Sequence, residues 1–527
     1  MRGEPAPPLA SFGGKRLPMR LSLLAVLALL VPAALAQRAP DPTVDRGALV
    51  RAIDAVLDDS LFADAHWGAL VVDVKKGDTL YARSEGRRFM LASNQKLITT
   101  AAALDRLGPG FTYTTGLYAD GPVHDGVLQG HLIVQGAGDP TIGRRFLNGQ
   151  KMDNLDEGDR TAVFRAWADS LKARGITRVA GHVIGDDNAF DDVPLGNAWT
   201  WDDQPFYYAA EIGALQFNEG LVDMTVRATS PGQPAAIAWE PLFTDYIRVD
   251  NQSRTTPRGT PYREGYFREL SGNTVTVSSE LPVGKADDEG VAIHDPTRYF
   301  VHTLRLVLRQ EGIGVEGEAL DADELPRALD YAGMRRVATY TSPPLRAIVE
   351  VVNEDSNNLY AEHLLKTMGA RAAPPLPDRT EPGSAYAGVL AMRPALAALG
   401  ADTLRMRIAD GSGLSYKNVS APADLVAVLR GMQLHPDTAV VNSYWESLPR
   451  GGEEGTLSGR YRRGLARGRV RAKTGFITGA RTLSGYVDTV GGRRLAFALL
   501  CNQYSTPTGR VNEVQDRIVE MLASYAK

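Results

Sequence analysis

Residues 92–97 read Ala-Ser-Asn-Gln-Lys-Leu, and they lie where an extended pattern gives way to a helical one. Apolar residues recur every three or four positions from Leu97 to Leu107, which predicts a helix that ends at the Gly-Pro pair that follows. Three-residue spacing puts Ser93 and Lys96 on one face of that helix, so the amine can reach the hydroxyl. A serine needs such a base to become a nucleophile, and the lysine must first lose its proton through burial or a nearby positive charge. Taken alone, the pattern is equally typical of a serine that caps a helix.

A second motif is Lys473-Thr474-Gly475, which lies on a strand predicted over residues 470–474. The lysine and the threonine offer a cation and a hydroxyl to a carboxylate, and the strand edge could receive an extended peptide. Gly475 leaves room for another backbone to approach closely. The alternative is a solvated lysine on an edge strand, followed by a turn.

The third motif is Ser356-Asn357-Asn358, which separates two helical patterns over residues 345–352 and 359–368. By itself it could be a loop that caps a helix, because serine and asparagine favour such positions. The order of the three motifs changes this interpretation. A Ser-x-x-Lys that opens a helix, a Ser-x-Asn between helices and a Lys-Thr-Gly on a late strand form the signature of penicillin-binding proteins and serine β-lactamases.

From about Asp54 to its end, the sequence resembles the class C penicillin-binding proteins, which are D-alanyl-D-alanine carboxypeptidases with endopeptidase activity. The resemblance is carried by the three motifs and by matches at Gly138-Asp139-Pro140, at Trp201-Asp202-Asp203 followed by Ala214-Leu215, and at Asp410-Gly411-Ser412-Gly413-Leu414-Ser415 followed by Asn418. It implies an α/β (α+β) fold, with a penicillin-binding transpeptidase-like domain whose central antiparallel sheet is flanked by helices. Extra domains are inserted between the first two motifs in this family, which matches the long separation of Ser93 from Ser356.

The two ends of the sequence carry the pattern of such a sheet. Residues 69–74 and 79–82 predict a β-hairpin. Three further strands are predicted at 470–474, 482–488 and 494–500, and an amphipathic helix at 511–525 is expected to pack on the sheet.

The middle of the sequence has a different texture, with many short strand-like runs, turn glycines and prolines. Strand-like runs include residues 130–135, 178–184, 222–228 and 273–278, and a helical pattern returns at 298–310. This middle part predicts one or two mostly β inserted domains at 112–325. A first catalytic part at 37–111 and a second at 326–527 would flank them, and a signal peptide is expected at 1–36.

The resemblance implies a two-step acyl transfer on peptidoglycan stem peptides. Ser93 would be the nucleophile, Lys96 its general base, and Ser356 a relay for the proton that the leaving amine needs. Substrate would be held by Asn358, Lys473, Thr474 and Gly475, and the backbone N–H groups of Ser93 and Phe476 would form the oxyanion hole. β-Lactam antibiotics would act as inhibitors by acylating Ser93.

Recognition of a diaminopimelyl stem peptide is implied for Asp203, Ile477 and the residue after Ser415. Family members usually carry arginine at that last position, whereas this chain has Tyr416 and then Lys417. Tyrosine cannot supply the charge of an arginine fork, so Lys417 is expected to substitute as a point charge. We therefore expect an ordinary catalytic centre with an altered stem-peptide preference.

Two rival functions remain open at this point, a serine β-lactamase and an inactive cell-wall binding protein. The long insertion argues against a compact β-lactamase, and the intact Ser93, Lys96, Ser356 and Lys473 argue against an inactive protein. The sequence contains no Gly-x-Ser-x-Gly elbow, which disfavours a Ser-His-Asp hydrolase, and no His-Glu-x-x-His pattern, which disfavours a zinc peptidase. No cofactor or metal is expected. A net charge of −4 with mixed signs gives no footprint for nucleic acid.

The start of the chain predicts export to the periplasm or another extracytoplasmic space. Lys15, Arg16 and Arg20 precede an apolar stretch from Leu21 to Val31, and Ala-Leu-Ala at 34–36 fits a signal peptidase site. That stretch is shorter than the about 20 residues that span a bilayer, although an uncleaved anchor is the alternative. Translation could begin at Met1 or Met19. No integral span is expected after cleavage, and the lone Cys501 excludes an internal disulfide.

Overall fold

The computed structural model describes residues 45–526, with gaps at 148–149, 153–157, 243 and 376–379. The predicted signal peptide at 1–36 and the choice between Met1 and Met19 lie outside the described residues. No helix in the described part is both long enough and apolar enough to cross a bilayer.

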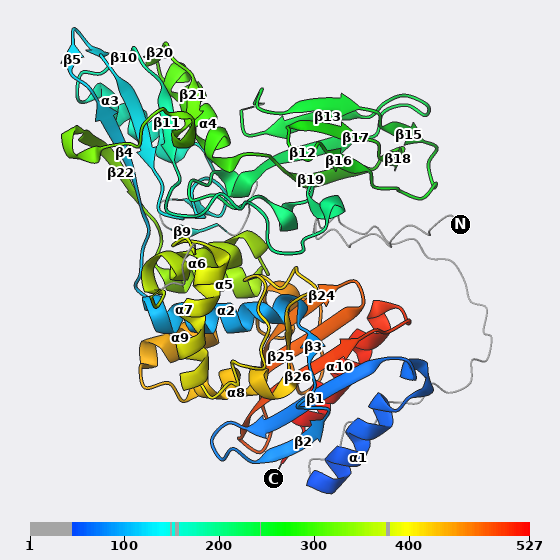
Figure 1. The fold of residues 1–527 in the computed structure, drawn as a ribbon. Coiled ribbons are helices and arrows are strands. Elements are labelled where there is room, and N and C mark those ends of the chain that lie inside the picture. Colours follow the sequence, from blue (N-terminus) through cyan, green and yellow to red (C-terminus); the bar gives the residue numbers. More distant parts are fainter. Residues whose placement is uncertain (1–44, 148–149, 153–157, 243, 376–379, 527) are drawn as a thin grey trace.

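A five-stranded antiparallel sheet joins the two ends of the described chain (Figure 1). Its strand order is β2-β1-β26-β25-β24. The strands are β1 (His66–Asp73), β2 (Thr79–Arg83), β24 (Val470–Ile477), β25 (Ala480–Asp488) and β26 (Arg494–Asn502). The predicted hairpin and the three predicted late strands are all confirmed.

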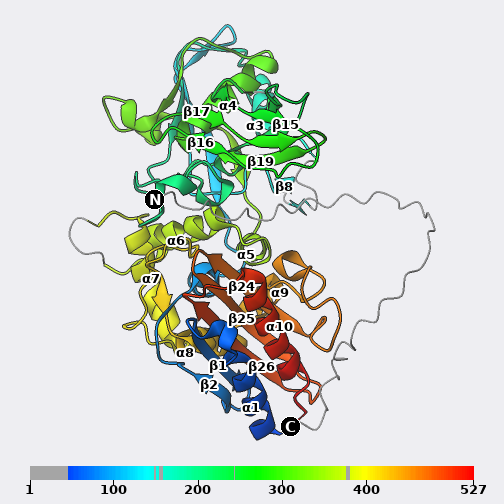
Figure 2. The same cartoon turned by 90° about the vertical axis from the view of Figure 1, so that its right-hand side faces the viewer.

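Helices cover both faces of this sheet, so its central strands are buried throughout (Figure 2). Side chains alternate between the two faces along each strand. Val71 and its register partner Phe497 pack with helices α1 (Arg46–Leu57) and α10 (Thr508–Ala523). Their neighbours Val72 and Ala496 point into the opposite core. This is why these strands read as continuous apolar runs rather than as half-polar ones.

The opposite core is built around α2 (Gln95–Leu107), whose first ten residues are all buried. A helix buried on every side must satisfy its polar side chains internally. Thr99 and Thr100 do so by donating hydrogen bonds to main-chain carbonyls. The other helices of this core are α5 (Leu345–Glu354), α6 (Asn358–Ala372), α7 (Ala385–Ala398), α8 (Pro422–Gln433) and α9 (Thr438–Ser447). A short pair, β3 (Phe89–Met90) with β23 (Val419–Ser420), lies beside it.

The chain between α2 and α5 forms a separate body with its own core, drawn above the sheet and helices in Figure 1. One five-stranded sheet has the order β21-β11-β7-β4-β22, and two three-stranded sheets have the orders β13-β12-β19 and β14-β17-β16. The longer strands of these sheets are β4 (Thr114–Asp120), β7 (His131–Gln135), β11 (Val183–Asp186), β12 (Leu221–Arg227), β13 (Ala236–Glu240), β14 (Arg248–Asn251), β16 (Tyr266–Arg268), β17 (Thr274–Val277), β19 (Ala286–Ala292), β21 (Ala319–Asp321) and β22 (Arg335–Thr341).

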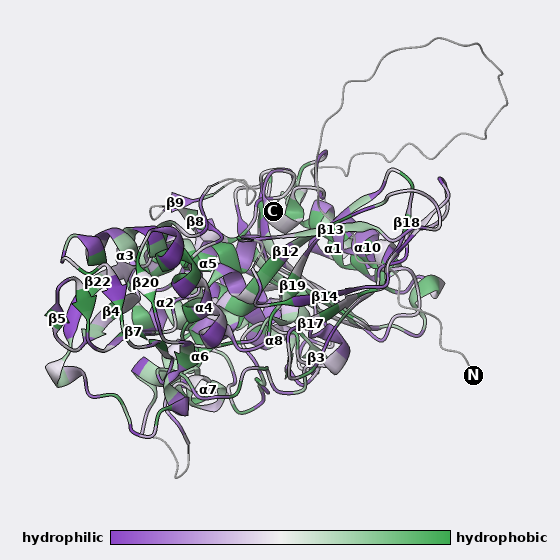
Figure 3. Cartoon of the chain, turned by 90° about the horizontal axis from the view of Figure 1, so that it is seen from above, coloured by the Kyte–Doolittle hydropathy of each residue, from purple (hydrophilic) through white to green (hydrophobic). Residues whose placement is uncertain are grey.

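Smaller pieces complete this inserted body. Short strands are β5 (Val123–His124), β6 (Val127–Leu128), β8 (Phe146–Leu147), β9 (Gln150–Lys151), β10 (Arg178–Val179), β15 (Arg254–Thr256), β18 (Glu280–Pro282) and β20 (Gly314–Val315). Two helices, α3 (Ala162–Lys172) and α4 (Pro296–Gln310), pack on its core. Helix α4 matches its predicted range and shows both hydrophilic and hydrophobic colours along its length (Figure 3).

Three details differ from the sequence interpretation. Helix α3 has no counterpart in it, although Phe164, Trp167, Ala168 and Leu171 are buried at helical spacing. The single run predicted at 178–184 is two strands, because β10 pairs with β6 and β20 in one sheet and β11 pairs with β7 and β21 in another. Gly181 lies between them, where a Cβ would be 2.4 Å from Gly130 O. Strand β22, which follows the predicted boundary at 325, pairs with β4 in the inserted sheet. We propose that the inserted part extends to Thr341.

Candidate active site

Ser93 lies in a tight 3-10 turn, Ala92–Asn94, that leads directly into α2. Ala92 has a φ of +46°, a left-handed conformation that only firm surroundings sustain. Two hydrogen bonds supply that support: Asn94 Nδ2 donates to Lys473 O at 2.8 Å, and Thr482 Oγ1 donates to Leu91 O at 2.9 Å. The turn is therefore fastened to strands β24 and β25, which brings the first and last motifs together.

Gly475 is required for this contact, as the sequence predicted. A Cβ at Gly475 would lie 2.2 Å from Thr482 Oγ1 and 3.0 Å from Ser93 N. Both separations are shorter than non-bonded atoms comfortably keep, so any larger residue would push β24 away from the turn at Ala92–Asn94.

Lys96 is completely buried, and its amine has three hydrogen-bond partners. Nζ lies 3.1 Å from Ser93 Oγ, 2.6 Å from Asn358 Oδ1 and 2.8 Å from Ser412 O. Burial lowers the pKa of Lys96 to about 7, although the carboxylates of Asp410 and Glu362 oppose this shift. A lysine with that pKa is partly neutral at neutral pH and can take a proton from Ser93.

Ser356 and Lys473 face each other on the other side of the nucleophile. Lys473 Nζ donates to Ser356 Oγ at 2.8 Å and to Thr474 O at 3.0 Å. Burial, and next the charges of Lys96 and Arg481, hold the pKa of Lys473 well below its usual value. Of the two causes that the sequence analysis named for Lys96, burial or a nearby positive charge, burial is the principal one at both lysines.

Asn358 links the amine of Lys96 to the inserted body. Its Oδ1 accepts from Lys96, and its Nδ2 donates to Tyr208 O at 2.7 Å. The hydroxyl of Tyr208 in turn donates to Asp203 Oδ1 at 3.1 Å. Asp203 therefore reaches the catalytic lysine only through Tyr208 and Asn358. Tyr208 has no role in the sequence interpretation, because a main-chain carbonyl leaves no signature in a motif.

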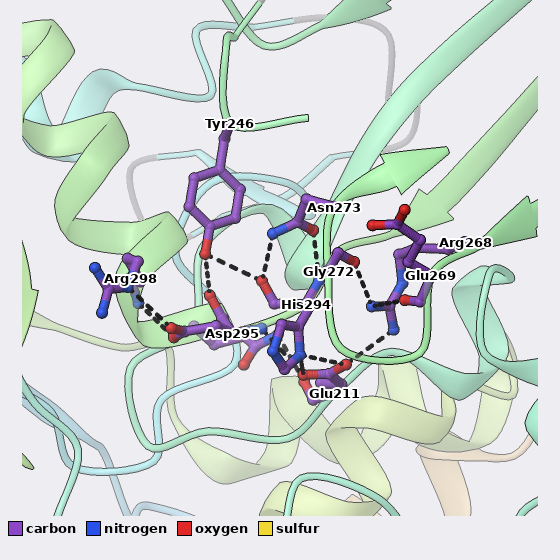
Figure 4. Close-up of polar contacts among 10 residues, drawn as sticks. Glu211, Tyr246, Arg268, Glu269, Gly272, Asn273, His294, Asp295 and Arg298 are labelled. Atoms are coloured by element: carbon purple, nitrogen blue, oxygen red, sulfur yellow. Dashed lines mark hydrogen bonds and ion pairs between the residues drawn. The ribbon is translucent and has the colours of Figure 1, made fainter. Parts of the chain in front are cut away.

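The segment that carries Tyr208 is anchored three residues later, at Glu211 (Figure 4). The Glu211 carboxylate receives Arg268 Nη2 at 2.8 Å, His294 Nδ1 at 3.0 Å and Asp295 N at 3.0 Å. Arg268 and Glu211 are almost completely buried. This cluster ties the segment to β16 and to the start of α4, and it limits the freedom of the carbonyl that orients Asn358.

Residues 410–415 form a loop against Lys96, which we call the 410–415 loop. Glu362, one helical turn after Asn358 on α6, accepts from Gly411 N at 2.9 Å and from Ser412 N at 2.8 Å. Asp410 accepts from Gly413 N at 2.7 Å and Ser415 N at 2.6 Å. The sequence singled out this loop but assigned no role to it or to Glu362. A carboxylate in the middle of a buried helix was the available signal for Glu362.

The side chains predicted to contact the substrate differ widely in their exposure. Tyr416 is 41% exposed, and Lys417 Nζ donates to Asn197 Oδ1 at 3.0 Å at the surface. Phe476 is 38% exposed on the edge strand β24. Ile477, by contrast, is 7% exposed and packs with Ala92 and Ala480 beneath the nucleophile turn.

Known proteins resemble this chain over nearly its whole length. The D-Ala-D-Ala carboxypeptidase 3 (S13) family matches residues 49–525. A D-alanyl-D-alanine carboxypeptidase of Actinomadura sp. (strain R39) is 33% identical over 487 residues, which cover 90% of this chain and 84% of the relative. The D-alanyl-D-alanine carboxypeptidase DacB of Haemophilus influenzae is 27% identical and covers 81% of this chain and 83% of its own.

The fold is also found among solved structures. Penicillin-binding protein 4 (dacB) of Haemophilus influenzae superposes with a TM-score of 0.75 at 22% identity and covers 90% of this chain and 99% of its own. The mixed α/β fold with helix-flanked sheets is therefore confirmed. With the family match spanning almost the entire described chain, this protein belongs to the D-Ala-D-Ala carboxypeptidase 3 (S13) family of serine peptidases.

Proposed function

We propose that this chain removes the terminal D-alanine from peptidoglycan stem peptides through an acyl-enzyme on Ser93. The carboxypeptidase activity follows from family membership, and the assignment of roles to residues is our inference. The observation that carries it is the 3.1 Å contact of the Ser93 hydroxyl with a buried amine whose pKa is about 7. A serine and a partly neutral lysine in hydrogen-bond contact can serve as a nucleophile and its base.

In the first step, Ser93 Oγ attacks the carbonyl carbon of the penultimate D-alanine, and its proton passes to Lys96 Nζ. The main-chain N–H groups of Ser93 and Phe476 stabilise the oxyanion, an interaction usually worth about 3 kcal/mol. The C–N bond to the terminal D-alanine then breaks. Ser356 relays a proton to the leaving amine. The proton that Lys96 took from Ser93 replaces it, so the step needs no other proton source.

Lys473 and Thr474 bind the carboxylate of the terminal D-alanine. The contact between Lys473 Nζ and Ser356 Oγ, at 2.8 Å, supports this assignment because it points the cation toward the leaving group. A bound carboxylate favours the charged form of Lys473. That charge in turn disfavours a second charge on Lys96, so substrate binding readies the base. Water then hydrolyses the ester and regenerates Ser93.

The same geometry supports two extensions of the activity. A peptide cross-link presents the same D-alanyl carbonyl with a different amine as the leaving group, so endopeptidase cleavage needs no further catalytic residue. A β-lactam would acylate Ser93 and stay attached because its leaving group remains tethered. Penicillin-binding protein 4 of Haemophilus influenzae has been solved in complex with a β-lactam, on a fold with a TM-score of 0.70 to this one. Family members act on the cell wall outside the cytoplasm, and we propose the periplasm for this chain.

The test is to incubate the purified protein with fluorescent penicillin and, separately, with a peptide that ends in D-alanyl-D-alanine. We expect stoichiometric labelling and release of D-alanine. Both should be lost in Ser93→Ala and retained in Ser230→Ala, which alters an exposed serine of the inserted body. Labelling of Ser93→Ala at the wild-type level would overturn the proposal. Rapid turnover of nitrocefin would favour a β-lactamase, and inactivity toward every substrate would favour a binding protein.

A further inference from the structure

The two residues that flank Ser356, Asp355 and Asn357, are hydrogen-bonded to charged side chains of the inserted body. Arg145 Nη1 donates to Asp355 Oδ2 at 2.9 Å. Arg145 Nε also donates to Glu219 Oε1 at 2.5 Å, and the other oxygen of Glu219 accepts from Asn357 Nδ2 at 3.0 Å. These three contacts link four side chains in a row, and the backbone from Asp355 through Ser356 to Asn357 closes them into a ring, which we call the Arg145 ring (Arg145, Glu219, Asp355 and Asn357).

Most of the Arg145 ring is buried, with only the side chain of Asp355 as much as 28% exposed, which makes its members depend on one another. The side chain of Arg145 is 14% exposed and that of Glu219 is 4% exposed. Burial alone would lower the pKa of Arg145, but the carboxylates of Glu219 and Asp355 outweigh it and raise the pKa. Arg145 therefore stays cationic. Removing one partner of such a group leaves an uncompensated buried charge, which is far more disruptive than breaking a surface ion pair.

The backbone inside the ring is in a conformation that requires external support. Ser356 has a φ of +62°, and Glu219 on the opposite side of the ring has a φ of +58°. Non-glycine residues adopt this left-handed region at a cost of about 1 to 3 kcal/mol, and they hold it only where the surroundings fix them. The ring fixes the residues on both sides of Ser356, and so it opposes relaxation of the Ser356 backbone.

The position of this backbone matters for the proposed chemistry. Ser356 Oγ accepts from Lys473 at 2.8 Å, and Asn358 Oδ1, two residues later, accepts from Lys96 at 2.6 Å. A change in the Ser356 backbone would move both contacts together. A misplacement of about 1 Å at such groups can lower a rate a hundredfold.

We propose that Arg145 and Glu219 are positioning residues for the peptidase reaction, acting through Asp355 and Asn357 on Ser356 and Asn358. This inference rests on the proposed function, and it gives the inserted body a direct part in catalysis. Lys151 reinforces the same connection, because its Nζ lies 2.8 Å from Glu354 Oε2 and 3.8 Å from Asp355 Oδ2.

The test measures acylation by fluorescent penicillin and turnover of a D-alanyl-D-alanine peptide in full-length Arg145→Met. We expect acylation to slow at least tenfold, with the loss in kcat rather than in KM, because substrate-binding groups on β24 are untouched. The matched control is Arg144→Met, because Arg144 pairs with Asp223, whereas Arg145 pairs with Asp355 next to Ser356. Burst titration counts the active sites, so a slower rate per active site separates mispositioning from partial unfolding.

Two further variants keep the inference testable if Arg145→Met folds poorly. Glu219→Gln keeps the volume and one acceptor but removes the charge, and we expect an intermediate loss of rate. Adding Asp355→Asn to Arg145→Met removes one of the two carboxylates that lose Arg145 and should recover part of the rate. Acylation of Arg145→Met and Glu219→Gln at the wild-type rate per active site would overturn the role of the ring. Failure of the wild-type protein to be labelled would instead overturn the proposed function.

Discussion

The carbonyl oxygen of Ser412 accepts a hydrogen bond from Lys96 Nζ at 2.8 Å, although 316 positions separate the two residues in the sequence. The N–H of that same peptide group, which belongs to Gly413, donates to Asp410 at 2.7 Å, and the N–H of Ser412 donates to Glu362 at 2.8 Å. Two buried carboxylates therefore fix the residue whose carbonyl contacts Lys96. The amine of Lys96 is held from three sides: by Ser93, by Asn358 and by the 410–415 loop.

Acylation by penicillin should depend on pH through Lys96. Burial lowers its pKa to about 7, and only the neutral amine can accept the proton of Ser93. We expect the second-order rate constant to rise about tenfold per pH unit below that pKa and to level off above it. Stopped-flow acylation between pH 5 and 9 measures this profile. A rate that is flat across this range would contradict the assignment of Lys96 as the base.

Replacing Glu362 by glutamine should move that profile to lower pH. Where it is ionised, the Glu362 carboxylate favours the charged form of Lys96, so its removal lowers the pKa of Lys96 further. Burial and the charge of Asp410 raise the pKa of Glu362 itself to about 8, so this effect grows as pH rises. The height of the profile should also fall, because glutamine has one acceptor oxygen where the carboxylate has two for the N–H groups of the 410–415 loop. The same acylation assay gives both quantities. A rising limb that stays in place or moves to higher pH would show that Glu362 does not influence Lys96.

The motif residues could be predicted because their chemistry requires particular side chains. The proposed nucleophile, base and carboxylate-binding cation call for a serine and two lysines, and the structure places Ser93 beside Lys96 and Ser356 beside Lys473. The sheet was predictable for a similar reason: strands buried on both faces give long apolar runs. These signals are local in the sequence, even where the contacts between them are not.

The contacts that tune the site were not predictable in this way. Ser412 and Tyr208 act through main-chain carbonyls, which every residue possesses. Ile477 is expected at the substrate from a resemblance alone, and its side chain packs with Ala92 and Ala480 in a small cluster that no motif reveals. The boundary predicted at residue 325 separated β22 from the inserted part, because its partner β4 lies more than two hundred residues earlier in the sequence.

Gly413→Ala should impair the site by forcing the 410–415 loop away from the nucleophile turn. A Cβ there would lie 1.9 Å from Ala92 O, and Gly413 has a φ of +87°. We expect a loss of about 2 kcal/mol or more in the free energy of unfolding, together with at least a tenfold loss in acylation rate. Gly492→Ala is the control, because its φ of +77° is similar but its Cβ would meet nothing within 4 Å. Equal effects of the two substitutions on acylation would refute the steric explanation.

Lys417→Ala should change stem-peptide preference without changing acylation by penicillin. Its ammonium is held by Asn197 at 3.0 Å at the surface, where it could meet a side-chain carboxylate of the substrate. We expect KM for diaminopimelate-containing peptides to rise severalfold and KM for lysine-containing peptides to stay the same, since only the former carry that carboxylate. A diaminopimelate preference that survives the substitution would rule out Lys417 as the charge that replaces arginine.

The cluster at Glu211 should make thermal stability depend on pH through His294. The hydrogen bond that His294 donates to Glu211 raises the pKa of His294 despite partial burial, so the folded protein binds this proton more tightly than the unfolded chain does. Burial would raise the pKa of Glu211, but the hydrogen bond from His294 and the charge of Arg268 outweigh it and lower that pKa. Arg268 and Asp295 are the other charged groups that act on the His294 imidazole.

The signs of these two shifts define a pH window. The His294 contribution is complete below about pH 6.5 and is lost as pH rises through its raised pKa. The Glu211 contribution is complete above about pH 4.5 and is lost as pH falls through its lowered pKa. We therefore expect wild-type Tm to fall more than that of His294→Gln between pH 5.5 and 8.5, when both are followed by circular dichroism. His124→Gln, at an exposed position on β5, should behave as the wild type does. Parallel curves for wild type and His294→Gln would mean that the His294 imidazole does not hold its proton more tightly in the folded protein.

The same titration should affect the rate of peptide hydrolysis, because Tyr208 and its contact with Asn358 lie three residues before Glu211. Loss of the His294 charge should slow hydrolysis at alkaline pH in the wild type but not in His294→Gln.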